Sequence, residues 1–214
     1  MYCIIDDGAI QYMSTIIGVC GTNFCTLCAD SRKVAYGSGG VEVVNDSTQK
    51  IFKLNDRVLF GVMGIFASHE SFLAPFEMYP DKSVITVRMA YKAVIDHINR
   101  NMNSICGCMF RNYFVGGKDN KGRFCIYEIH LNTETKEIET TLRIPEPPTY
   151  NFSVSCGLPF SLQTQKQEYI GLVGAAVTSC STHAQMVDSL KNIINKIAEN
   201  DVTVGGEVQV VSVF

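Results

Sequence analysis

The chain has 214 residues, of which 46% are hydrophobic and 18% are charged. This is enough apolar material for one large core, and no Pro- or Ser-rich linker divides the chain, so we expect a single domain. The net charge of -3 provides no basic surface for nucleic acid or an anionic membrane. No apolar run approaches the ~18 residues of a membrane span, and the start lacks the features of a signal peptide. We therefore expect a protein of the cytoplasm and nucleus that binds neither nucleic acid nor membrane.

The stretch at 14–30, STIIGVCGTNFCTLCAD, consists of two apolar runs around the loop Gly-Thr-Asn at 21–23. Apolar runs that flank a short loop with Gly and Asn are typical of a β-hairpin. A three-residue loop centred on Thr22 would place Ser14 opposite Asp30. The sequence therefore predicts a hydroxyl and a carboxylate at the open end of a hairpin.

Nine cysteines, an odd number without a secretion signal, favour reduced thiols over a disulfide framework. Cys25 and Cys28 have the CxxC spacing of half a zinc site, but alternation along a strand would place them on opposite faces. The pair Cys106 and Cys108 does not have the spacing of structural zinc ligands either. We expect no metal and no other cofactor.

The remaining elements follow from periodicity and turn signals. Short β-prone runs at 41–44, 50–54 and 58–62 predict a strand meander. Helical spacing predicts one helix over 65–78, a second that begins after Asp81 or Ser83, and a third from a capping box at Thr182 to Asn200. Further strands are expected at 110–115, 124–129, 140–144, 150–155 and 207–214, and the segment 169–177 is ambiguous between helix and packed loop. This order predicts an α+β fold, a four-layer αββα sandwich of two antiparallel sheets flanked by helices.

Several motifs resemble a known family. The run STIIGVCGTNFCTLCADSRK, followed by DSTQKIFKLNDRVLFGVMG, resembles the beta-type subunits of the eukaryotic 20S proteasome, which share a TT(V/I)-hairpin-ADSR-KI-G(x)G pattern. The likeness continues through FVGGKDNKGRFCIYEI and ends in NDVTVGGEVQV, which is similar to the family's RDxxSGGxVxV close. The resemblance covers most of the chain and implies the N-terminal nucleophile (Ntn) hydrolase fold.

The resemblance also implies a mechanism. A hydroxyl residue exposed by removal of a propeptide attacks the peptide carbonyl, and its own α-amino group takes the proton, because the pKa of that amine is near ~7.7 to 8.0. A lysine favours the neutral amine, and an aspartate holds the lysine. Ser14 falls at the nucleophile position, Asp30 at the aspartate, Lys50 at the lysine and Asp201 at a late family aspartate.

Other positions depart from this pattern. Met13 stands where self-processing members have glycine, and Cys156 and Val204 replace two serines that support the amine. With Met13 still attached, Ser14 has an amide nitrogen and no general base. We therefore expect residues 1–13 to be an N-terminal extension or unprocessed propeptide, and residues 14–214 to form one beta-type domain whose site positions are not active.

The sequence thus predicts a structural subunit that helps to form the inner ring and chamber of the core particle in ubiquitin-dependent protein degradation. Its partners would be alpha- and beta-type subunits in a 28-subunit hetero-oligomer, with polypeptide substrates passing through the chamber. An active hydrolase with Ser14 exposed by cleavage after Met13, and a stand-alone binding domain, are the alternatives. The segment 158–181 loosely resembles the insertion of the sixth beta-type subunit, while the third, fourth and seventh positions stay open.

Overall fold

The structure is a computed structural model, and it describes residues 9–12, 14–37, 40–67, 71–102, 110–132, 135–147 and 152–214. Met13, Cys106 and Cys108, which the sequence singled out, lie outside these residues. Within the described ranges, the chain forms two antiparallel sheets and three α-helices. The α+β class predicted from the order of the elements is therefore confirmed.

The larger sheet contains eight strands of the described chain: β1 (Ala9–Tyr12), β4 (Lys33–Gly37), β5 (Gly40–Asn45), β6 (Ile51–Asn55), β7 (Val58–Ala67), β8 (Phe110–Lys118), β9 (Phe124–Asn132) and β10 (Glu137–Arg143). Their order is β10-β9-β8-β7-β1-β4-β5. One edge of β7 pairs with β8, and its other edge pairs first with β6 and then with β1. The strand β1, which ends two residues before Ser14, thereby joins β7 to β4.

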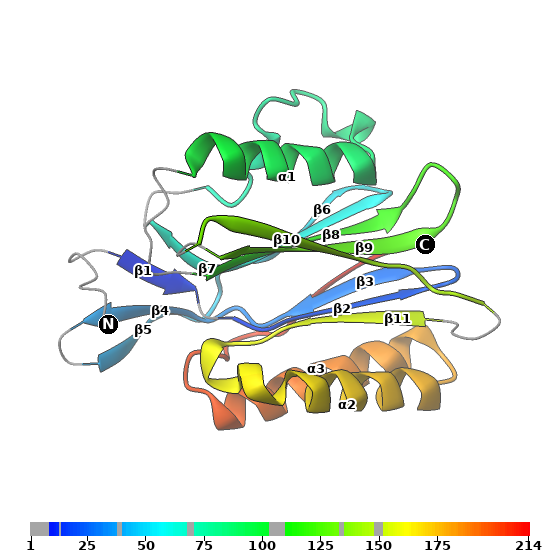
Figure 1. The fold of residues 1–214 in the computed structure, drawn as a ribbon. Helices are drawn as coiled ribbons and strands as arrows, with labels where there is room; N and C mark the ends of the chain where they lie inside the picture. The colour runs from blue at the N-terminus through cyan, green and yellow to red at the C-terminus, as the bar shows by residue number, and fades with distance from the viewer. Residues whose placement is uncertain are drawn as a thin grey trace.

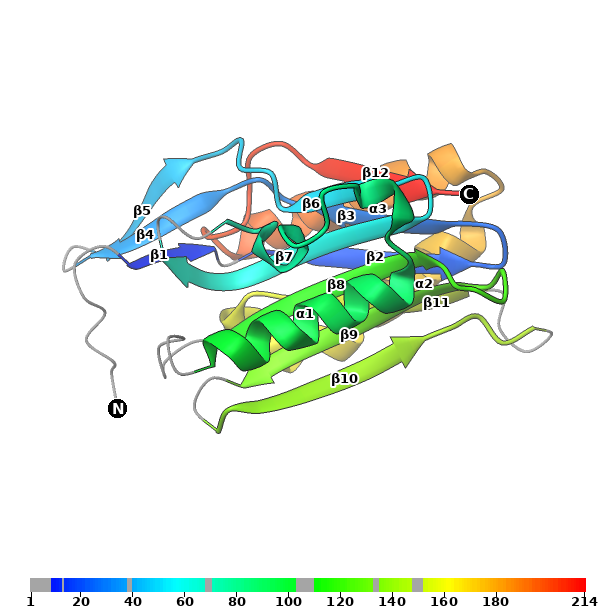
Figure 2. The same ribbon diagram turned by 90° about the horizontal axis from the view of Figure 1, so that it is seen from above.

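The smaller sheet contains β2 (Ile16–Gly21), β3 (Cys25–Ala29), β11 (Phe152–Gly157) and β12 (Gln209–Val213), in the order β11-β2-β3-β12. Helix α1 (Val87–Asn101) lies on the outer face of the larger sheet. Helices α2 (Lys166–Ser179) and α3 (His183–Asn200) lie on the outer face of the smaller sheet (Figure 1). The view from above shows α1 running along β8 and β9 (Figure 2).

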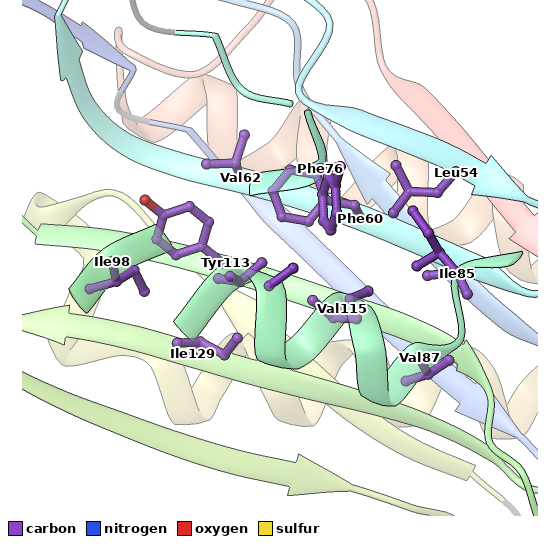
Figure 3. Packing of buried hydrophobic residues seen from close by; sticks show 14 of the residues in the cluster. Leu54, Phe60, Val62, Phe76, Ile85, Val87, Ile98, Tyr113, Val115 and Ile129 are labelled. Carbon is purple, nitrogen blue, oxygen red and sulfur yellow. The ribbon is translucent and has the colours of Figure 1, made fainter. Parts of the chain in front are cut away.

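The buried apolar residues form three clusters, one under α1, one under α2 and α3, and one between the sheets. Strand β7 contributes side chains to two of these clusters, because successive side chains of a strand point to opposite faces. Phe60 and Val62 face α1, while Leu59 and Met63 face the smaller sheet. Figure 3 shows the first cluster, in which side chains from the sheet meet those of α1 and of the preceding turns.

The hairpin predicted at 14–30 is present as β2 and β3, but its predicted register was wrong by one residue. Cys20 pairs with Cys25, and the N–H of Gly21 donates to the carbonyl of Phe24 at 2.9 Å. The loop is therefore the two-residue turn Thr22–Asn23, the commonest hairpin length. Because the loop is one residue shorter than predicted, Thr15 rather than Ser14 lies opposite Asp30.

The helix predicted over 65–78 was also wrong. Strand β7 continues to Ala67, and the only helical part of the described segment 71–80 is a 3₁₀ turn at Ala74–Phe76. A strand buried on both faces is apolar at every position, so its sequence does not show the period of two. The spacing that suggested a helix belongs instead to a short turn whose Phe76 packs completely buried against the α1 cluster.

The ambiguous segment at 169–177 lies inside α2, and α3 begins where its capping box predicted. The Thr182 hydroxyl accepts a hydrogen bond from the Gln185 N–H at 3.2 Å, and the Gln185 side chain accepts one from the Thr182 N–H at 3.2 Å. Two of the helix's first N–H groups are thus satisfied, as a capping box requires.

We expect Thr182→Ala to lower the free energy of unfolding by about 1 kcal/mol, because the first turn of α3 loses its cap. Urea unfolding followed by circular dichroism measures this change. The matched control is Thr178→Ala in α2, whose exposed hydroxyl donates to the Gly174 carbonyl one turn earlier. A Thr182 variant as stable as this control would contradict the capping role.

Candidate functional site

The carboxylate of Asp30 is hydrogen-bonded to Thr15, the residue that follows Ser14. Thr15 donates its N–H to Asp30 Oδ1 at 2.9 Å, and Asp30 returns its own N–H to the Thr15 carbonyl at 3.3 Å. Ser14, Thr15 and Asp30 are all completely buried. The hairpin therefore places the predicted nucleophile position and the predicted aspartate at one point, through Thr15 rather than by direct pairing.

Lys50 reaches the same carboxylate from the start of β6. Its Nζ lies 2.9 Å from Asp30 Oδ2 and also donates to the Arg32 carbonyl, and both side chains of the ion pair have no exposed surface. The backbone N–H of Lys50 donates to Gln209 Oε1 at 3.0 Å, which attaches this residue to β12. The structure thus brings together three of the predicted site residues, Ser14, Asp30 and Lys50.

Burial acts strongly on both members of this pair. It raises the pKa of the Asp30 carboxyl and lowers the pKa of the Lys50 ammonium, because each charged form has lost its water. The opposite charge and the hydrogen bonds to Asp30 counter this effect. The Thr15 N–H donates to Oδ1, while Oδ2 accepts from Lys50 Nζ and from the N–H groups of Arg32 at 3.1 Å and Gly205 at 3.2 Å. A carboxylate with four donors is well placed to hold a lysine in a fixed position.

A second ion pair closes the site toward solvent. The guanidinium of Arg32 contacts the Asp46 carboxylate with both Nε, at 2.7 Å, and a terminal nitrogen, at 3.2 Å. The other terminal nitrogen of Arg32 donates to the carbonyls of Val202 at 3.1 Å and Val204 at 3.4 Å. Arg32 therefore connects the loop that follows β5 to the loop that supplies the Gly205 N–H.

Sequence reasoning missed the roles of Gly205, Arg32 and Asp46. Arg32 and Gly205 do lie inside the quoted motifs ADSRK and VTVGGEVQV, so the signal was present. The donor that Gly205 contributes is a backbone N–H, however, and residue type alone does not indicate where a backbone group points.

The other predicted positions lie around this site but do not share its ion pair. Asp201 is the C-cap residue after α3, and its carboxylate accepts from the Thr203 N–H at 2.8 Å and from the hydroxyls of Thr203 and Ser161. Cys156 in β11 and Val204 are completely buried in the apolar cluster under α2 and α3. Burial raises the pKa of the Cys156 thiol to about 12, so this group is a packing residue and a poor nucleophile.

The cysteines of the CxxC motif separate as strand alternation predicted. Cys25 lies in the cluster between the sheets, whereas Cys28 lies in the cluster under α2 and α3. Within the ranges that the structure describes, no group of three or more His, Cys, Asp or Glu side chains has the arrangement of a metal site. None of the described helices is long and apolar enough to cross a membrane.

Two facing antiparallel sheets, with a buried lysine–aspartate pair beside a hydroxyl residue at the start of the hairpin, fit the Ntn-hydrolase type of fold. Comparison with family models supports this class, since the model described as "Proteasome subunit" matches residues 12–141, more than half of the chain. The chain belongs to the proteasome subunit family. A comparison with curated protein sequences gave no match. Family membership gives the chain a role in the proteasome core and in proteolysis, in assembly with other proteasome subunits.

Proposed function

We propose that this chain is a non-catalytic beta-type subunit of the 20S proteasome core particle. In this role it helps to form the inner ring of a 28-subunit hetero-oligomer in the cytoplasm and nucleus, where ubiquitin-dependent degradation takes place. The hairpin-ADSR and VGGEVQV motifs support the beta-type assignment. The packing of helices on the outer faces of two sheets is compatible with the fold expected of such a subunit.

The observation that carries the non-catalytic proposal is the position of β1. This strand leads toward Ser14 and pairs on both edges, with Ile10 opposite Ala35 of β4 and Tyr12 opposite Gly64 of β7. In this form the nitrogen of Ser14 is a peptide amide, which cannot accept the proton of the attacking hydroxyl. Release of a free amine at Ser14 would require cleavage between Met13 and Ser14, just after a strand, β1, that is paired on both edges.

The two altered support positions point the same way. Val204 is completely buried among apolar side chains, and the side chain of a valine can neither donate nor accept a hydrogen bond. Cys156 has taken up the same kind of apolar packing. In this chain, both positions that would hold a serine beside a free amine contribute to the core instead.

The mass of the intact subunit, measured after purification of the assembled particle, tests this proposal. We expect a chain that retains the β1 residues. Subunits of the same particle that are active provide the internal control, because their masses should correspond to chains that begin at their nucleophile. A mature chain that begins at Ser14 would refute the proposal.

An active hydrolase is the second candidate. The intact Asp30–Lys50 pair, with its 2.9 Å contact, favours it, because it preserves the lysine that would favour the neutral form of a free amine at Ser14. Replacement of Ser14 by alanine separates the two candidates. We expect every peptide-cleaving activity of the particle to stay unchanged, as with the control Thr22→Ala at the exposed hairpin tip. Loss of one activity in the Ser14 variant alone would establish the hydrolase.

A further inference from the structure

Strand β5 is an edge of the larger sheet that is exposed along its whole length. It pairs with β4 and ends the strand order, and each of its six residues is exposed. In both ribbon views, the hairpin of β4 and β5 lies at one end of the molecule, beyond the ends of the helices (Figures 1 and 2). The backbone groups on the outer side of such a strand have no ladder partner within the described chain.

The side chains of β5 are unusually apolar for this exposure. Val41, Val43 and Val44 are 39%, 42% and 49% exposed, and they are three of the eight large apolar side chains exposed in the described residues. Val41 and Val43 share one face by alternation. Val44 is the extra residue of a β-bulge, because Val34 pairs with Val43 while Lys33 pairs with Asn45.

A fourth exposed valine lies close to the end of this strand. Val202 is 59% exposed, and its carbonyl accepts from Arg32, whose guanidinium also holds the carboxylate of Asp46, the residue after β5. Half of the exposed large apolar side chains of the described chain therefore gather at this end of the molecule. We call the residues Val41, Glu42, Val43, Val44 and Val202 the β5 surface.

The opposite edge of the same sheet provides a comparison. Exposed edge strands of natural proteins are usually protected by charges, proline or short length. Strand β10 has Glu137, Glu139 and Arg143 along the sequence EIETTLR, whereas β5, with the sequence GVEVVN, has Glu42 as its one charge. The two edges of the sheet thus differ in charge. The composition of β5 is typical of a strand that another chain covers.

We propose that the β5 surface is where a neighbouring subunit of the proteasome family docks, with an extended segment of that subunit pairing along β5. This inference rests on the proposed function, since family membership implies assembly with other such subunits. Apolar side chains would cover Val41 and Val43, and a Lys or Arg opposite Glu42 would pair with the only charge of the strand. An apolar strand with one acidic residue therefore defines the chemistry of the partner's segment.

The first test replaces Val43 with lysine and measures how much of the subunit is incorporated into the particle in cells. We expect incorporation to fall by about tenfold or more, because a charge would be buried in the contact. The matched control is Leu142→Lys on β10, which is 44% exposed at the opposite edge and should be incorporated like the wild type. Since both positions are exposed, the isolated variants should melt at the temperature of the wild-type chain, which separates docking from folding.

The second test places a photo-crosslinking amino acid at Glu42, with Thr141 of β10 as the control position. In the assembled particle, we expect Glu42 to crosslink to another proteasome subunit. A crosslink to a second copy of this chain or to a substrate polypeptide, or normal incorporation of Val43→Lys, would overturn the inference while leaving the proposed function intact. A wild-type chain absent from the particle would instead refute the proposed function and the docking partner together.

Discussion

Replacement of Asp30 by alanine is expected to lower the free energy of unfolding by about 3–5 kcal/mol. The substitution leaves the Lys50 ammonium completely buried without its counter-charge, 2.9 Å from where the carboxylate was. It also removes the acceptor of the N–H groups of Thr15, Arg32 and Gly205. An unpaired buried charge and unsatisfied buried donors are among the few changes with effects of this size. Urea unfolding at neutral pH, followed by circular dichroism, measures the loss.

The control for this prediction is an ion pair of similar length at the surface. Lys53 and Asp56 lie 3.1 Å apart with largely exposed side chains, so Asp56→Ala should leave the unfolding curve unchanged within error. The double variant Asp30→Ala with Lys50→Met should lose less stability than the two single variants added together, because it contains no unpaired charge. Additive losses would show that the pair is not coupled as its geometry indicates.

The sequence was sufficient to predict the elements that have a strong local pattern. The capping box and apolar stripe of α3 and the alternation that separates Cys25 from Cys28 depend on residues near one another in the chain. The register of the first hairpin depends instead on how many residues the turn contains, and Gly21 fits a two-residue or a three-residue loop equally well. A difference of one residue in the loop was enough to move Thr15 into the place expected for Ser14.

Strand β7 shows why the remaining elements were harder to predict. Its neighbours are β8, β6 and β1, which come from both sides of it in the sequence, so no local signal specifies that it is buried on both faces. The place of β1 in the sheet is equally non-local. Only the tertiary arrangement shows that the segment before Ser14 joins β7 to β4.

The hairpin pattern predicted that Ser14 and Asp30 meet, whereas the place of Lys50 in the site was predicted only through resemblance. Asp30 and Lys50 are 20 residues apart in the sequence. Asp30 follows β3 of the smaller sheet and Lys50 precedes β6 of the larger sheet, so no periodicity relates them. What the sequence could not indicate was the set of backbone donors around Asp30, of which the Gly205 N–H comes from 175 residues away. The loop after α3 therefore contributes to the site as much as the hairpin of β2 and β3 does.

That dependence leads to the second large effect, which is expected for Gly206→Ala. Gly206 has φ +73°, in the left-handed region, and a Cβ there would overlap the carbonyl oxygen of Asp46 and the hydroxyl of Ser31. We expect a loss of about 2–4 kcal/mol, from the unfavourable backbone conformation together with this overlap. The loop would have to shift, and the neighbouring Gly205 N–H would move away from Asp30.

Gly122→Ala is the matched control, because Gly122 has a similar φ of +78° but open space where its Cβ would be. Its expected loss, about 1 kcal/mol, isolates the cost of the backbone conformation. The difference between the two variants then measures how tightly the loop after α3 is held against the residues that follow Asp30. If the two losses are equal, the loop after α3 can shift without a cost in stability. The Gly205 N–H then cannot be what fixes the Asp30 carboxylate. If Gly206→Ala loses more and its loss shrinks in the Asp30→Ala background, the loop and the ion pair form one structural unit.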